Sequence, residues 1–301
     1  MKSILTILII LSTSNSYSQK MENSYFTWEE FVSNFGKEMV SAEDVHGQMV
    51  KSGLIDYSLG NFDFHFISDK KENLESLSQF IREHYPYEIK ALKSIEKGLW
   101  ELYGLTNEIP VTAENLLYWG LDMYKRGYEF DSKLEGYGAL YDHRKPKLPN
   151  LEKTQEDLYF DKGVDCYNSG DLSGAIINWT LVIAINQNDP NAYYSRAIVK
   201  NELHTWKSAI ADYDKAIELA PDFASAIANR GTVKDENGDY DGALRDYNRA
   251  LELEPNNAMT FFNIGNTKFN QGLHSEACAS WKKAKELGAE YAQERLENNC
   301  E

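Results

Sequence analysis

The sequence predicts two domains of different class, an α+β domain in the N-terminal half and an all-α array of helical repeats in the C-terminal half. Small and aromatic residues recur every 34 positions from residue 156 onward, which is typical of stacked helix pairs. Before residue 142, segments of alternating apolar and polar residues alternate with helical stripes, which indicates a sheet covered by helices. The length of 301 residues leaves room for about two domains.

The composition indicates a folded and acidic protein. Hydrophobic residues make up 42% of the chain, and 31 Lys and Arg against 47 Asp and Glu give a net charge of −16. The apolar content supports packed cores. The acidity argues against a protein that binds nucleic acid by neutralising phosphates, because such domains are usually basic. We therefore expect no nucleic-acid partner.

Residues 1–18 have the pattern of a cleavable secretory signal. Lys2 precedes an unbroken apolar run from Ile4 to Leu11, which is too short to span a bilayer. Residues 16–18 (SYS) place small side chains before a cut at Gln19. We expect an exported protein, periplasmic or secreted, with no membrane span. The alternative is a cytoplasmic protein that starts at Met21.

The first helix of the N-terminal half is predicted to follow Thr27. Thr27 and Glu30 have the spacing of a capping box, and Phe26 can staple against Phe31 across the helix start. Ser41 is predicted to open a second, shorter helix.

From residue 61 the pattern predicts the order β-α-β-β-α-β within a domain over 19–142. Apolar alternation predicts strands at 62–66, 87–91, 100–102 and 128–140, with a turn at 96–98. Helical stripes predict one helix capped by Asp69 and a second helix after Pro110. This order is that of the split ferredoxin-like arrangement.

Three stretches of this domain resemble the regulator of ribonuclease activity B family over about residues 61–142. They are NFDFHFISDKKENLESLSQFI (61–81), RGYEFD (126–131) and LEGYGALYD (134–142). The resemblance implies a ferredoxin-like fold and binding to a ribonuclease, which members of that family inhibit. A cytosolic ribonuclease regulator is therefore the alternative function, whereas an exported protein would share only the fold.

Residues 143–155 contain two prolines and few apolar residues, which predicts a linker. The repeats then cover 156–189, 190–223, 224–257 and 258–291, with a capping helix before residue 301. Their eighth, twentieth and twenty-fourth positions are small, small and aromatic, so that two helices can approach closely around a ring. These positions are Gly163, Ala197, Gly231 and Gly265; Ala175, Ala209, Ala243 and Ala277; and Trp179, Tyr213, Tyr247 and Trp281.

This pattern resembles the tetratricopeptide repeat (TPR) family over 156–291 and implies a TPR solenoid. Pro221 and Pro255 end the second helix of their repeats. Repeat 1 has Gln187 at the corresponding position, which predicts a longer second helix.

The resemblance implies an inner face, lined by the first helix of each repeat, that binds a peptide or helix of another protein. Mapping those positions predicts partner-binding residues at Phe160, Tyr167, Tyr194, Ile198, Asn201, Phe262, Asn266 and Phe269; repeat 3 contributes Ala228, Thr232 and Asp235. Only Asn266 matches the Lys and Asn set with which related co-chaperones clamp a terminal carboxylate. The alternative is that these aromatic residues are buried against a neighbouring repeat or domain.

The sequence gives no sign of catalytic chemistry. The six histidines lack the spacing of metal ligands, and Asp63 and His65 lie on the strand face opposite the phenylalanines, which favours a solvated face. Cys278 and Cys300 can pair as a disulfide in an exported protein or remain as two free thiols, and Cys166 fits a helix-packing position. We predict a non-enzymatic interaction scaffold without cofactor or metal.

Overall fold

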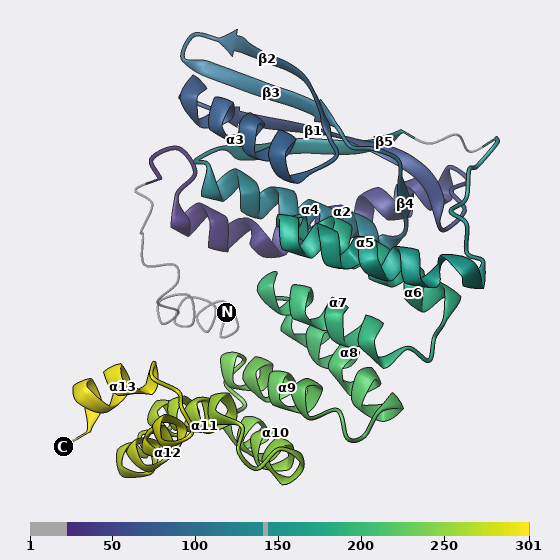
Figure 1. Cartoon of the computed structure of the whole chain (residues 1–301). Helices are drawn as coiled ribbons and strands as arrows, with labels where there is room; N and C mark the ends of the chain where they lie inside the picture. Colours follow the sequence, from purple (N-terminus) through teal and green to yellow (C-terminus); the bar gives the residue numbers. More distant parts are fainter. Residues whose placement is uncertain (1–22, 141–143, 301) are drawn as a thin grey trace. The chain divides into compact units, whose positions relative to one another are not determined.

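The computed structural model describes residues 23–140 and 144–300, and Figure 1 shows their secondary structure. The predicted signal segment and Met21 lie outside these residues. The chain divides into two compact units, of which unit 1 ends at Asn186 and unit 2 begins at Gln187.

Unit 1 combines an antiparallel sheet with helices. The β-α-β-β-α-β order is present, with one additional short strand before the second sheet-covering helix. The elements are α2 (Trp28–Lys51), β1 (Ser58–Ser68), α3 (Lys71–His84), β2 (Glu88–Glu96), β3 (Leu99–Leu105), β4 (Ile109–Val111), α4 (Ala113–Glu129), β5 (Lys133–Leu140), the short 3-10 helix η2 (Lys153–Gln155), α5 (Glu156–Ser169) and α6 (Leu172–Ile185).

Strand β1 is the centre of the sheet. It pairs with β3, β4 and β5, and β2 pairs with β3, all in antiparallel fashion. Phe62, Phe64 and Phe66 on β1 are fully buried on the face that α3 and α4 cover (Figure 1). The N-terminal half therefore contains a small antiparallel sheet with one covered face. Its ferredoxin-like classification stays a prediction.

The start of α2 has the predicted capping box. Thr27 N donates to Glu30 Oε2 at 3.2 Å, and Glu30 N donates to Thr27 Oγ1 at 3.3 Å. The prediction of a separate helix at Ser41 is wrong, because α2 continues to Lys51 with a buried stripe that includes Ala42 and Met49. The predicted cap of α3 is also wrong, since Lys70 is the N-cap residue and makes no side-chain capping bond.

Helices α5 and α6, which form the first predicted repeat, belong to unit 1. Helix α6 is apolar nearly all round, and such a helix must be buried on more than one side. It packs against α5 and α4, and Ile177 joins the core that contains Phe62 and Trp119. The compact unit thus extends one helix pair beyond the division at 143–155 that the sequence suggested.

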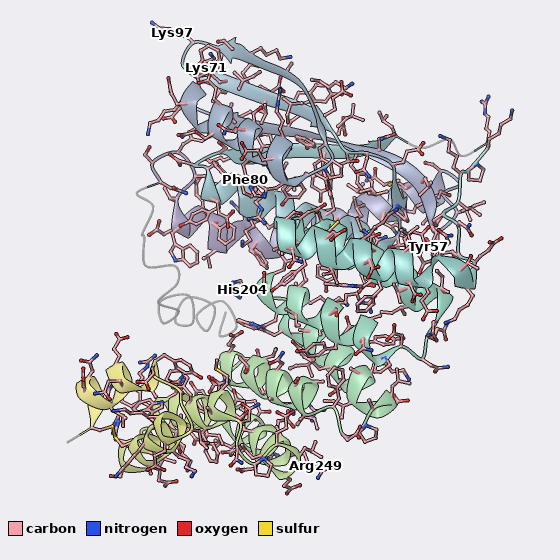
Figure 2. All side chains as sticks on the ribbon, viewed as in Figure 1. Tyr57, Lys71, Phe80, Lys97, His204 and Arg249 are labelled. Carbon is pink, nitrogen blue, oxygen red and sulfur yellow. A yellow bond between two sulfur atoms is a disulfide. The ribbon has the colours of Figure 1, made fainter. Side chains whose placement is uncertain are left out.

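A buried polar network accompanies this packing. Tyr85 Oη donates to Asp122 Oδ2 at 3.0 Å and accepts from Arg126 Nε at 2.9 Å. Ser173 N at the start of α6 donates to the same Asp122 oxygen at 3.1 Å. The Arg126 guanidinium lies 5.0 Å from the ring centre of Phe80, which is labelled in Figure 2. The network therefore connects α4 to both α6 and the loop after α3.

Unit 2 is entirely helical. Each of the predicted repeats 2, 3 and 4 is one helix pair, and a short helix follows the last pair. The helices are α7 (Pro190–Glu202), α8 (Trp206–Leu219), α9 (Ala224–Glu236), α10 (Tyr240–Leu253), α11 (Ala258–Asn270), α12 (His274–Glu286) and α13 (Ala292–Asn299).

The prediction of a longer second helix in repeat 1 is wrong. Helix α6 ends at Ile185, which is the same repeat position as the ends of α8 at Leu219 and α10 at Leu253. The turn to the next helix begins there because Asp189 caps α7, with its Oδ1 accepting from Asn191 N at 2.8 Å.

Candidate functional site

The repeated small and aromatic residues pack against each other within each helix pair. A Cβ atom placed on Gly163 would lie 2.5 Å from Trp179 Nε1, and one placed on Gly231 would lie 2.9 Å from Tyr247. Gly265 is blocked in the same way by Trp281. The eighth position is small because the aromatic ring of the paired helix occupies the space that a larger side chain would need.

The first helices of repeats 2, 3 and 4 form one surface in unit 2. Helix α9 packs against both α7 and α11. Asn229 Nδ2 on α9 donates to Tyr194 Oη on α7 at 3.2 Å, and Asn263 Nδ2 on α11 donates to Thr232 Oγ1 on α9 at 3.4 Å. We call the exposed and half-buried side chains of α7, α9 and α11 the inner surface.

All eight predicted partner-binding residues are half-buried, but the structure divides them between the units. Phe160 and Tyr167 lie on α5 in unit 1, each with its ring centre 6.4 Å from that of Trp179. The other six lie on α7 and α11 in unit 2. The described inner surface therefore consists of repeats 2, 3 and 4.

The three residues on α7 contribute an aromatic, an aliphatic and an amide group. The Tyr194 ring lies 4.7 Å from Phe223 and 6.0 Å from Tyr213, so one of its faces is packed. Ile198 follows one turn later and is half-buried. Asn201 Oδ1 is buried and accepts no hydrogen bond among the described residues.

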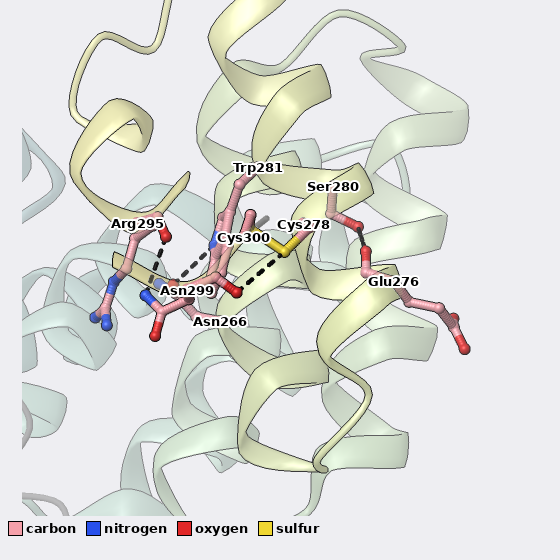
Figure 3. Close-up of a disulfide and its surroundings, with 8 residues drawn as sticks. All are labelled: Asn266, Glu276, Cys278, Ser280, Trp281, Arg295, Asn299 and Cys300. Carbon is pink, nitrogen blue, oxygen red and sulfur yellow. Dashed lines mark hydrogen bonds between the residues drawn. A yellow bond between two sulfur atoms is a disulfide. The ribbon is translucent and has the colours of Figure 1, made fainter. Parts of the chain in front are cut away.

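The three residues on α11 have structural contacts that the sequence did not predict. Asn266 Oδ1 accepts a hydrogen bond from Trp281 Nε1 at 3.1 Å, as Figure 3 shows. The Phe269 ring lies 5.6 Å from that of Trp281, and Phe262 meets Tyr291 edge to face at 4.8 Å. These side chains therefore help to hold repeat 4 and the segment after it, and only part of each is available to a partner.

Two acidic residues in the last turn of α9 stand out on the inner surface. Burial raises the pKa of Glu236 to about 7, and polar contacts with Asn201 and Trp206 oppose that rise only in part. Burial also raises the pKa of Asp235, next to Thr267 and Asn270 on α11. The repeat alignment placed Asp235 on this face but did not single out Glu236.

The cations of the same helices are paired elsewhere. Arg196 and Lys200 on α7 bind Asp212 on α8 at 2.7 and 2.8 Å. The same arrangement recurs 34 residues later on α9 and α10, with distances of 2.6 and 2.7 Å to the acid, for Arg230, Lys234 and Asp246. This periodic trio was a sequence signal for repeats 2 and 3 that the small and aromatic positions did not include.

Cys278 and Cys300 form a disulfide, drawn in Figure 3. The bond joins α12 to the residue after α13. The Cys278 Sγ lies 3.6 Å from the carbonyl oxygen of Asn299, and Ala289 and Ala292 are buried beside Trp281. The disulfide thus fastens α13 over the apolar end of repeat 4.

The remaining candidate groups offer no assembled site. His65 Nδ1 lies 2.9 Å from Glu101 Oε1 on β3, with 37% of the His65 side chain exposed. The Cys166 thiol has a pKa raised to about 12, chiefly by burial. Within residues 23–140 and 144–300, no group of three His, Cys, Asp or Glu side chains could hold a metal ion, and no helix is long and apolar enough to cross a membrane.

The comparisons with known proteins agree with the repeat architecture. A family model described as TPR repeat matches residues 236–272. The heat shock protein sti1 homolog of Schizosaccharomyces pombe is 28% identical over 151 residues, which are 44% of this chain and 25% of the relative. The Hsp70-Hsp90 organizing protein 2 of Arabidopsis thaliana is 29% identical over 155 residues, 44% of this chain and 27% of the relative. The C-terminal region contains tetratricopeptide repeats.

Solved structures give the same picture of the fold. MamA has a TM-score of 0.43 at 24% identity and matches 46% of this chain and 81% of its own. The first TPR of Spaghetti (RPAP3), bound to an HSP90 peptide, has a TM-score of 0.39 at 24% identity over 40% of this chain and 94% of its own. The chain spans about a quarter of the length of the curated relatives it matches.

Proposed function

We propose that the protein is a non-catalytic scaffold whose inner surface in unit 2 binds an extended segment of another protein. The observation that carries the proposal is the pair of buried acceptors on this surface, Asn201 Oδ1 and Asp235 Oδ1, that have no hydrogen-bond partner among the described residues. A buried polar atom without a partner costs about 1–3 kcal/mol. The backbone N–H groups of an extended peptide would satisfy such acceptors, with Tyr194 and Ile198 as apolar contacts beside them.

We further propose that the protein is exported. The apolar run of residues 4–11 supports this proposal, and the Cys278–Cys300 disulfide agrees with it because such bonds persist in oxidising compartments. Sequencing the N-terminus of the mature protein tests it. A chain that starts at Gln19 would support export, whereas one that starts at Met1 or Met21 would contradict it.

The binding proposal is tested by capture from the envelope fraction of the source cell, with the full mature chain as bait. Asn201→Ala is the most informative variant, because its Oδ1 has no partner to lose and the fold should be unaffected. We expect its captured partner to be reduced about tenfold, equivalent to roughly 1.4 kcal/mol of binding free energy. Arg249→Ala on α10 is the control, since Arg249 is exposed and pairs only with Glu252 in the described residues.

Equal capture by wild type and Asn201→Ala, with an unchanged far-UV spectrum, would show that the inner surface is not the binding site. Loss of capture by Arg249→Ala as well would place the partner on the opposite helices.

A further inference from the structure

The last turn of α9 concentrates negative charge. Asp235 and Glu236 are adjacent there, in the final turn of a helix that ends at Glu236. The C-terminal end of a helix carries the negative end of its dipole, so that cations are favoured there and carboxylates are not. Two acids at this position are therefore opposite to what helix stability alone would favour.

Neither acid has a counter-charge among the described residues. No Lys or Arg contributes to the environment of Asp235 or Glu236 there. The basic residues of α9 itself, Arg230 and Lys234, are held by Asp246 on α10. Partly buried carboxylates without a cation are costly, so a bound cation would relieve the structure at this point.

The polar atoms around the two acids are incompletely satisfied. Trp206 is 9% exposed and its Nε1 makes no hydrogen bond in the described part of the chain, although the indole faces Glu236. Asn201 Oδ1 and Asp235 Oδ1 are likewise buried without a partner. The cluster therefore offers a donor as well as acceptors. An extended peptide presents both backbone N–H and C=O groups and can match this mixture, whereas a simple metal ion cannot use the indole N–H.

We propose that this cluster, at the crossing of α7, α9 and α11, selects partner segments that carry a lysine or arginine side chain. The proposal deepens the proposed function, on which it rests, by naming the chemistry of the partner. The ammonium or guanidinium group lies against Asp235 and Glu236, and the peptide backbone contacts Asn201 and Trp206. The charge of the selected group is opposite to that of the terminal carboxylate considered in the sequence analysis. Charge complementarity of this kind chiefly determines which partner is accepted.

The test uses three pools of synthetic decapeptides with random flanking residues and a fixed central residue, which is lysine, norleucine or glutamate. The full chain is immobilised, and the retained peptides are quantified by mass spectrometry. We expect the lysine pool to be retained about tenfold more than the norleucine pool, and the glutamate pool least, since tenfold corresponds to roughly 1.4 kcal/mol. The preference should weaken as ionic strength rises.

The variant that tests the site is Asp235→Asn with Glu236→Gln, which removes both charges and keeps both shapes. We expect the lysine preference to disappear while the norleucine pool is retained as by the wild type. The single variants Asp235→Asn and Glu236→Gln serve if the double variant does not fold. Glu252→Gln is the matched control, because it removes an exposed acid from α10.

The outcomes separate this proposal from the one on which it rests. Equal retention of all three pools by the wild type would overturn the selectivity and leave peptide binding intact. A lysine preference that survives in Asp235→Asn/Glu236→Gln would also overturn it, by placing the selection elsewhere. Retention of no pool above a blank surface would overturn both proposals.

Discussion

Arg126 on α4 donates a hydrogen bond from Nη2 to the carbonyl oxygen of Gly170 at 2.8 Å. Gly170 is the left-handed C-cap of α5, with φ of 86°, so the guanidinium binds the turn that separates the two helices of the first repeat. The same guanidinium contacts Asp122 at 3.3 Å and Glu129 at 2.8 Å. One buried cation therefore joins the sheet domain to the first helix pair.

Replacing this cation should destabilise unit 1 strongly. Arg126→Met keeps the apolar stem but leaves Asp122, which is fully buried, without its ion-pair partner. Removing one partner of a buried pair costs about 3–5 kcal/mol. We expect thermal unfolding followed by circular dichroism to show an early transition for unit 1. Lys71→Met is the control, because Lys71 forms an exposed pair with Glu75 and should leave the curve unchanged. Coincident curves for Arg126→Met and wild type would contradict the structural role of this network.

The stability of unit 1 should fall as pH rises through neutrality because of Asp171. Burial and the nearby charge of Asp122 raise the pKa of Asp171 to about 7 in the folded chain, against roughly 3.9 for an unperturbed Asp. The folded state therefore binds an extra proton between about pH 4 and pH 7. The stabilisation that this proton gives is present at low pH and is lost as pH rises towards 7.

The variant Asp171→Asn should remove this dependence. Asn is also a good N-cap residue, so its Oδ1 can keep the bonds from Gly174 N and Ser173 Oγ that Asp171 Oδ1 accepts at 2.7 and 3.1 Å. We expect the loss of unfolding free energy between pH 5 and pH 8 to be smaller in the variant by at least about 1 kcal/mol, since one pKa unit corresponds to 1.36 kcal/mol. Asp189→Asn, at the N-cap of α7, is the control. Parallel pH profiles for wild type and Asp171→Asn would refute the assignment.

The sequence was most informative where a physical requirement repeats. The columns that contain Gly163 and Trp179 recur because each helix pair solves the same packing problem, so all helix pairs could be predicted from them. The unit boundary could not, because a period of 34 residues describes contacts within the array and says nothing of what its first pair packs against. The signal was present in α6, whose apolar residues surround the helix, while α10 has polar residues on one side.

The candidate site was predictable by position but not by availability. Repeat alignment places Asn201 and Asn266 at positions of the inner face, yet only the structure shows that Asn266 is bonded to Trp281. The importance of Glu236 depends on its burial and on the pairing of nearby cations with Asp246, which are relations between helices that spacing along one helix does not show. The ribonuclease role implied for the N-terminal domain stays a prediction.

Adding one methyl group at Gly265 should destabilise unit 2. Alanine is favoured over glycine within helices by up to about 1 kcal/mol, but a Cβ at Gly265 would overlap the buried Trp281 ring, and overpacking costs about 1–3 kcal/mol. We expect Gly265→Ala to lower the unfolding midpoint in urea. Gly36→Ala is the matched control, because no atom lies within 4 Å of a Cβ at that helical position, and it should be neutral or stabilising. Stabilisation by both substitutions would show that the eighth position is not limited by the ring.

Reduction of the disulfide should loosen the C-terminal end of unit 2 without affecting unit 1. Cys278 and Cys300 are 22 residues apart, and closing a loop of that length stabilises the folded state by about 3 kcal/mol in the chain-entropy model. We expect Cys300→Ser, or dithiothreitol added to the wild type, to speed hydrogen exchange in α13 and in the α12 segment around Trp281, as measured by mass spectrometry. Cys166→Ser keeps the disulfide and should retain wild-type exchange in these helices. Unchanged protection of α13 after reduction would show that the contacts of Ala289 and Ala292 hold the helix without the covalent bond.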